Sequence, residues 1–195
     1  MANAAGVGAV ALIDQLRNRT RDLHEGLELD LDWERRMATL KGYTRLLARW
    51  WGFHAVFEPL LETKPPFVGL DGRGKLHLIE RDLHHLGFSP DAIAALPRIE
   101  ALTFLSDRAS MVGAMYVVEG STLGGQVISR HVRHLHGPEI SDGACAYFLG
   151  YGKAATAPMW RAFQDRLLGI ESSSHDAVVT GARQTFQTLR DWLPR

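Results

Sequence analysis

The chain has 195 residues, 46% of them hydrophobic and 23% charged, which is the balance of a soluble globular protein with a buried core. Lysine and arginine together number 22, as do aspartate and glutamate, so the formal net charge is zero. A neutral chain is not attracted over distance to nucleic acid or to an anionic membrane, and we expect neither as a partner.

The N-terminal third of the chain predicts two helices and a loop. Residues 9–29 carry leucines with the spacing of an amphipathic helix, and residues 1–8 before them are expected to be a flexible N-terminus. Asp32 can cap a second helix over residues 33–62. This helix ends before residues 63–72, a loop rich in proline and glycine.

The remaining two thirds of the chain are also predicted to be helical. Ser89, followed by a proline, can cap a short helix over residues 89–96, and a long helix can run from a cap at Ser106 to Gly137. Residues 138–157 are rich in glycine, alanine and proline and predict a loop. Further helices are expected over residues 74–87, 158–171 and 174–193. The chain therefore predicts one all-α domain over residues 1–195, a bundle of about seven or eight helices.

The cysteine content and the apolar runs bear on the cellular compartment. Cys145 is the only cysteine in the sequence, which rules out an internal disulfide and favours a reducing, cytoplasmic location. No apolar run of about 18 residues is present, so no membrane-spanning helix is predicted. The apolar stretch near the N-terminus has no basic region before it, and we expect no secretory signal.

A histidine on the first predicted helix has the surroundings of a metal ligand. Relative to Leu16, a step of about 100° per residue places His24, Arg17 and Glu28 at about 80°, 100° and 120°, on one flank of the leucine stripe. A ligating histidine needs a partner for its second ring nitrogen, and Glu28 can accept that hydrogen bond. An ordinary histidine–glutamate pair at the edge of the core has the same spacing, so both interpretations stay open.

The long predicted helix contains glycines that share one face. Gly113, Gly120 and Gly124 fall within about 40° of one another, with Val117 and Ser121 beside them. A glycine inside a helix costs about 1 kcal/mol relative to alanine, so some contact must require the missing side chains. The contact is either a bound molecule that touches the backbone or a close crossing with another helix.

Other histidines suggest a different metal site. His54 with Glu58, and Glu80 with His77 and His84, have the three- or four-residue spacing that a carboxylate di-iron oxygenase could use. The matching pairs of Glu-x-x-His on partner helices are not present in the sequence. We keep this site as an alternative.

Two stretches, "TRDLHEGLELD" and "MYVVEGSTLGGQ", resemble the heme oxygenase family, and the helix order of the whole chain is similar to that family as well. The "EGSTLGG" form resembles the bacterial branch that is associated with phytochrome chromophore supply. This resemblance implies a heme held between the first helix and a distal helix that is kinked at its glycines.

The resemblance implies a role for each matching residue on the two helices. His24 would be the proximal iron ligand and Glu28 its partner. Gly120 and Gly124 would bring the distal backbone close to the macrocycle, and Gly125 would ease the bend.

The resemblance also implies residues that hold water and the heme edge. Ser121 stands where mammalian relatives carry an aspartate that organises the distal water, and a hydroxyl can hold water without carrying its charge. Tyr116 and Val117 are expected beside the heme. Arg17 is the candidate for a propionate contact because it shares the flank of His24, and Arg161 and Lys153 are further candidates.

The implied reaction is oxidative opening of heme by O2 and electrons, which yields biliverdin, carbon monoxide and ferrous iron. The sequence has no flavin or nicotinamide motif, so the electrons would come from an external ferredoxin or flavin reductase. A bacterial phytochrome is an expected recipient of the product. A non-catalytic heme carrier or sensor on the same fold would use the same residues and remains an alternative.

Overall fold

The computed structural model describes residues 4–63 and 72–195, with side chains from Leu12 onward, and the described chain is helical without any strand. The elements are α1 (Ala4–Leu31), α2 (Trp33–Arg36), α3 (Leu40–Glu62), α4 (Leu76–His85), α5 (Pro90–Ala94), α6 (Arg108–Gly143), α7 (Ala146–Leu149), α8 (Gly152–Leu167), a 3-10 turn (Ser172–Ser174) and α9 (His175–Trp192). The all-α prediction is confirmed, with the expected number of helices once the single turns α2 and α7 are set aside.

The boundaries differ from the prediction near the N-terminus. Residues 4–8, expected to be flexible, belong to α1, while residues 1–3 lie outside the described range. The predicted cap at Asp32 is wrong, because this residue has a left-handed backbone with φ 40° and its side chain forms no capping bond. The chain instead breaks after the single turn α2, and Thr39 caps α3 by accepting the N–H of Gly42. Most of the predicted loop, residues 64–71, lies outside the described range.

The long helix α6 begins and ends at different residues from those predicted. Asp107 rather than Ser106 caps it, in a capping box with Ser110. Within α6, which is described throughout, the residue with a non-helical backbone is Gly137, at φ 80°. Pro138 follows and is compatible with the first turn of a new helical segment, so the helix resumes and runs to Gly143.

The prediction of a loop over residues 138–157 is therefore wrong. Besides the end of α6, this range contains α7 and the start of α8. Helix α7 begins where the buried carboxylate of Asp82, in α4, accepts the first two N–H groups of α7, both at 2.8 Å. Helix α4 begins in the same way, because Glu58 of α3 accepts the N–H groups of Lys75 and Leu76 at 2.8 and 3.0 Å. These caps come from distant parts of the chain and leave no local sequence signal.

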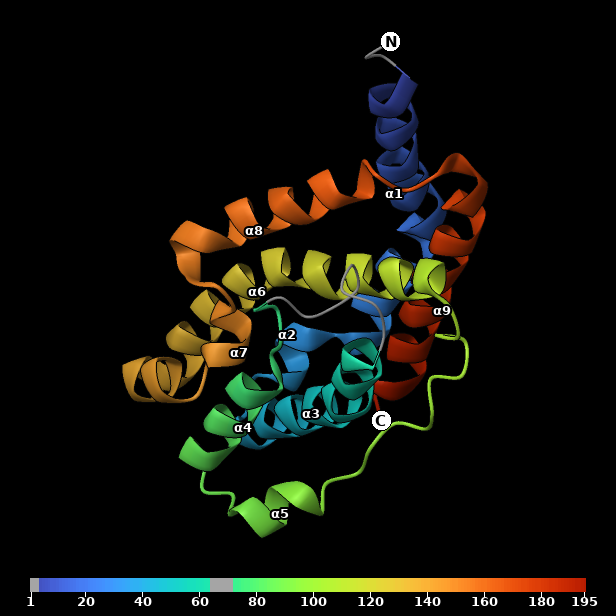
Figure 1. Cartoon of the computed structure of the whole chain (residues 1–195). Coiled ribbons are helices and arrows are strands. Elements are labelled where there is room, and N and C mark those ends of the chain that lie inside the picture. The colour runs from blue at the N-terminus through green and yellow to red at the C-terminus, as the bar shows by residue number, and fades with distance from the viewer. Residues whose placement is uncertain (1–3, 64–71) are drawn as a thin grey trace.

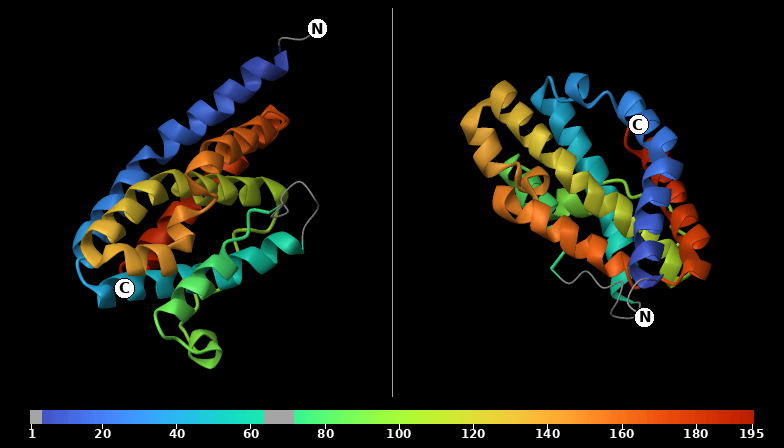
Figure 2. Two further views of the ribbon diagram at one scale, coloured as in Figure 1. Left: turned by 90° about the vertical axis from the view of Figure 1, so that its left-hand side faces the viewer. Right: turned by 90° about the horizontal axis from the view of Figure 1, so that it is seen from above.

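Helix α9 occupies a central place among the long helices. It packs along α6 and along α1, whereas α1 and α6 are not among the helix pairs with extensive contacts. Figure 1 shows α6 crossing the middle of the molecule with α8 beside it, and Figure 2 shows α1 and α9 side by side. On the other side of α6, α3 packs on α4 and α7 packs on both α4 and α6.

Two glycines allow α6 and α9 to cross closely. A Cβ atom at Gly113 would overlap the carbonyl oxygen of Val178 and lie 2.6 Å from the amide nitrogen of Ala182. On the opposite helix, a Cβ atom at Gly181 would overlap the backbone of Ser110. Gly113 is therefore explained by helix packing, one of the two contacts that the sequence left open.

Among the described side chains, three ion pairs join α1 to α9, and their order shows that the two helices run in the same direction. They are Arg19 with Asp176 at 2.5 Å, Asp22 with Arg183 at 2.9 Å, and Asp30 with Arg190 at 2.6 Å. All three are partly or largely exposed, and such a pair contributes about 0–1 kcal/mol. Their role is to align the two helices more than to stabilise the fold.

In the part of the chain that the structure describes, no helix combines the length and the apolarity that a bilayer crossing requires.

Because α6 and α9 cross so closely, we predict that one added methyl group at the crossing strongly destabilises the protein. We expect Gly113→Ala to lower the free energy of unfolding by about 2 kcal/mol or more, because the two backbones must separate to admit the Cβ atom. Urea unfolding followed by circular dichroism measures the change. Gly124→Ala in the same helix is the control, since a Cβ atom there meets nothing within 4 Å. Equal stability of the two variants would contradict the crossing.

Candidate functional site

The predicted site residues of α1 lie on its exposed side. The side chains of His24 and Glu28 are 55% and 63% exposed, and the Nε2 atom of His24 lies 3.8 Å from the Oε1 atom of Glu28. This distance permits an electrostatic contact but exceeds that of a hydrogen bond. Both groups are therefore accessible to a bound molecule, and the expected hydrogen bond is not formed in this conformation.

Phe186 supports the His24 ring from α9. The two rings meet edge to face, with centroids 5.6 Å apart and planes at 83°, and Phe186 is 6% exposed. One edge of the imidazole thus rests on the core while the rest of the ring faces outward. Sequence reasoning missed Phe186, although it continues the apolar spacing of Val178, Val179 and Ala182 along α9.

The glycine face of α6 is open. Among the described residues, a Cβ atom at Gly124 would have no neighbour within 4 Å, and one at Gly120 would reach only Trp160, at 3.8 Å. Leu123 and Val127 flank this face and are 43% and 48% exposed. A helix crossing does not explain Gly120 and Gly124 within the described chain, and the two side chains add exposed apolar surface beside them.

Gly125 has a different environment from its neighbour. A Cβ atom there would overlap the carbonyl oxygen of Phe148 in α7, so the glycine permits α7 to pack on α6. The residue of α6 with a non-helical backbone is Gly137, so Gly125 itself keeps helical torsion angles. Gly125 is thus a packing residue in this structure.

Tyr116 of α6 is affected by the charge of Arg17 in α1. Burial raises the pKa of Tyr116, and the positive charge of Arg17 partly offsets this effect. Trp160 of α8 packs against the Tyr116 ring with centroids 5.6 Å apart. Sequence reasoning missed Trp160, which lies beside Gly120 in space but 40 positions away in the chain.

The other predicted residues are divided between the open face and the core. Ser121 is exposed, and its hydroxyl donates a hydrogen bond to the carbonyl oxygen of Val118 at 2.8 Å. Arg161 and Lys153 are exposed on α8. Val117 is only 4% exposed and belongs to the hydrophobic core, so it is not presented at the open face.

A small cavity lies behind Ser121. It has a volume of about 60 Å³, and its lining includes Ser121, Thr122, Lys75, Tyr147 and Trp50. Space of this size can admit water where polar groups line it. The cavity connects the surroundings of Ser121 with a network of buried polar side chains.

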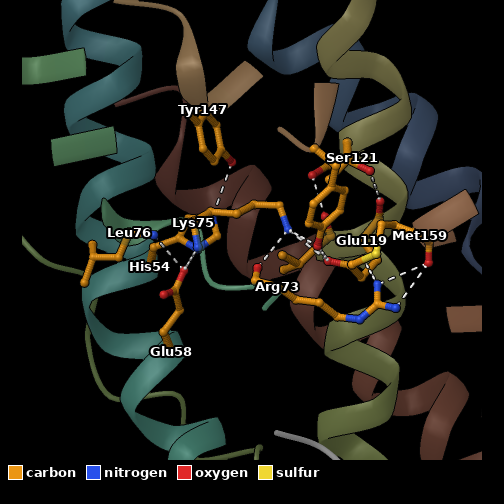
Figure 3. A network of polar contacts seen from close by, with 12 residues as sticks. His54, Glu58, Arg73, Lys75, Leu76, Glu119, Ser121, Tyr147 and Met159 are labelled. Carbon is orange, nitrogen blue, oxygen red and sulfur yellow. Dashed lines mark hydrogen bonds and ion pairs between the residues drawn. The ribbon is translucent and has the colours of Figure 1, made fainter. Parts of the chain in front are cut away.

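His54 and Glu58 belong to this network (Figure 3). The Nδ1 atom of His54 lies 2.8 Å from Glu58 Oε1, and the Nε2 atom lies 3.3 Å from the hydroxyl of Tyr147. Burial lowers the pKa of His54. Burial opposes ionisation of Glu58, but the His54 contact and the N–H groups of Lys75 and Leu76 outweigh it and lower its pKa.

These two residues are therefore structural. A neutral His54 donates from Nδ1 to the Glu58 carboxylate, and Glu58 also caps α4. Among the residues described, no group of three or more histidine, cysteine, aspartate or glutamate side chains is placed to hold a metal ion. The di-iron alternative has no site in that part of the chain.

The comparisons with known proteins agree with this architecture. A family model described as heme oxygenase matches residues 10–195. The heme oxygenase of Leptospira interrogans has a similar structure, with a TM-score of 0.75 and 15% sequence identity over 94% of this chain and 98% of that chain. The NO- and CO-bound heme oxygenase of Neisseria meningitidis has a TM-score of 0.66 and 20% identity over 92% of this chain and 90% of that one. No curated protein sequence matches this chain.

Because the face at Gly124 is open, we predict that glycine at this position makes the free protein less stable than alanine would. We expect Gly124→Ala to raise the free energy of unfolding of the free protein by up to about 1 kcal/mol, because alanine favours a helix and its methyl group meets no neighbour. Thermal unfolding of the variant and the wild type measures the difference. A loss of stability would show that an unrecognised contact fills this face.

The buried His54 predicts a loss of stability in mild acid. Its pKa is lowered from 6.5 in the folded state, so below that pH the unfolded chain binds a proton that the folded chain does not. The unfolding free energy of the wild type should therefore fall relative to that of His54→Gln as the pH decreases from 7 to 5, by at most about 1.4 kcal/mol per pH unit. Urea unfolding at several pH values tests this, and parallel curves for the two proteins would refute it.

Proposed function

Because the chain belongs to the heme oxygenase family, whose members are oxidoreductases that degrade heme, we propose that it opens the heme macrocycle to biliverdin and releases carbon monoxide and ferrous iron. The observation that carries the proposal is the open backbone of α6 at Gly124, flanked by exposed apolar side chains. A flat apolar substrate is a ligand that benefits from a wall without side chains.

His24 is the proposed iron ligand. Its ring is exposed, and Phe186 limits its rotation from the core side. A small movement of Glu28 toward the ring would convert the 3.8 Å contact into a hydrogen bond, which fixes the tautomer and direction of a ligating imidazole. A bound heme would supply both the iron that activates oxygen and the carbon atom that is oxidised.

The edge and the distal side of the substrate involve other residues. Arg17 is the proposed propionate partner, since its side chain is 64% exposed on α1 and its positive charge acts on Tyr116 of α6. Arg161, one position after Trp160, is a second proposed partner. Ser121, with the backbone at Gly120, is proposed to hold water beside the small cavity. The backbone at Gly120 and Gly124 and this water would direct oxygen toward the heme ring, and neither would act as a strong acid or base.

The partners follow from the resemblance to the bacterial branch. We propose an external ferredoxin or flavin reductase as the electron donor, a cytoplasmic location, and a bacterial phytochrome as a recipient of biliverdin. The alternative of a heme carrier or sensor predicts the same binding but no turnover. An open wall at Gly120 and Gly124 favours catalysis, because a carrier needs no particular shape on the side opposite His24.

The test is to add hemin to the purified protein, then a reductant in air, and to follow the absorption spectrum. We expect a Soret band that decays into the broad red band of biliverdin, and a weaker Soret band with little decay for His24→Ala. His134→Ala, which alters an exposed histidine at the far part of α6, is the control and should behave as the wild type.

Two other results would contradict the proposal. A Soret band that survives the reductant in air would identify a carrier or sensor. Absence of any Soret band would exclude heme binding altogether.

A further inference from the structure

A buried group of charges gathers around Glu119 of α6, close to Ser121 (Figure 3). Glu119, which precedes Gly120, is only 1% exposed. Its carboxylate contacts the guanidinium of Arg73, accepts a hydrogen bond from Lys75 Nζ at 2.9 Å, and accepts another from the Tyr151 hydroxyl at 2.8 Å. Arg73 and Lys75 are 4% and 2% exposed. We call these four residues the Glu119 clamp.

The clamp joins elements that are distant in the chain. Arg73 also donates to the carbonyl oxygen of Met159, in α8, at 3.2 Å. Lys75 Nζ also donates to the Tyr151 hydroxyl at 3.2 Å, and Tyr151 is the residue immediately before α8. The backbone N–H of Lys75 binds Glu58 of α3. Through Glu119, α6 is therefore tied to α3, to the segment before α4 and to α8.

Stability alone does not explain the clamp. Removing three charges from water costs several kcal/mol per ion, and apolar side chains of similar size often stabilise a protein equally well or better. In addition, the Nε atom of Arg73 is buried without a hydrogen-bond partner in the structure. Hydrogen bonds between charged groups have a fixed direction, whereas apolar contacts do not.

The glycine segment of α6 needs such a fixed direction. Gly120 and Gly124 have no side chains that could hold the helix from the front, and α1 makes no extensive contact with α6. Packing at Gly113 and Gly125 constrains the two ends of the segment. The Glu119 side chain is the polar anchor between those two points, on the turn that presents Gly120 and Ser121.

We propose that Arg73, Lys75 and Tyr151 are positioning residues that act through Glu119 to fix the rotation of α6 at Gly120–Gly124, and hence the place of the backbone wall against the substrate. The effect on the substrate rests on the function proposed above. The effect on the helix does not, and it can be measured in the free protein.

The test compares Tyr151→Phe and Lys75→Met with Tyr43→Phe. The control removes another tyrosine hydroxyl, which is bonded to the carbonyl oxygen of Ala144 at 2.5 Å, beyond the far end of α6. In the free protein we expect amide hydrogen exchange at residues 120–125 to be at least about tenfold faster in both clamp variants, with exchange in α9 unchanged. The control should leave residues 120–125 as in the wild type.

The second measurement is the isomer composition of the bilin formed from heme. We expect the two clamp variants, and not Tyr43→Phe, to form a changed mixture of isomers, because a rotated wall directs oxygen to a different ring carbon. If Lys75→Met does not fold, Tyr151→Phe decides, since it removes one hydroxyl and no charge.

The outcomes separate the two proposals. Faster exchange at residues 120–125 in a protein that never forms bilin would support the clamp and refute the proposed function. Clamp variants that only melt earlier, with wild-type exchange at residues 120–125 and a wild-type isomer mixture, would overturn the clamp.

Discussion

The close crossing of α6 and α9 is the contact on which the rest of the structure depends. Gly113 and Gly181 each lie against the backbone of the opposite helix, and a contact between two backbones cannot adjust by changing side-chain rotamers. Helix α9 also packs along α1, and three ion pairs join the two helices. The two helices that form the proposed substrate site therefore owe their relative position to α9 more than to contact with each other.

Glycine has two opposite roles along α6. At Gly113 and Gly125 the missing side chain admits another backbone, and the contact repays the conformational cost of glycine. At Gly124 no atom of the residues that the structure describes uses the space, so the same cost is not recovered there. A binding surface that is less stable than it could be is typical of functional sites. Gly124 therefore supports the proposed function, whereas Gly113 and Gly125 allow the helices to pack.

Buried charges complete the support of this surface. Glu58 and Asp82 cap the first turns of α4 and α7, and Glu119 binds two cations. Burial raises the pKa of Asp82 to about 6 even though two N–H groups bind it. All three carboxylates act between elements that are far apart in sequence. They define the positions of short helices and turns that apolar packing alone would leave less precisely fixed.

The sequence by itself determined the helical class, the approximate positions of the long helices and the two stretches that identify the family, because periodic apolar spacing and short motifs are local properties. It also brought out His24 and the glycine-rich stretch of α6. It could not distinguish Gly113 and Gly125 from Gly124, nor His54 with Glu58 from His24 with Glu28, since each set has similar helical spacing. Only the tertiary structure distinguished these residues, because their roles depend on which atoms lie opposite each side chain or glycine. The same reason explains why Phe186, Trp160 and the partners of Glu119 were missed: each acts on a residue at least 32 positions away.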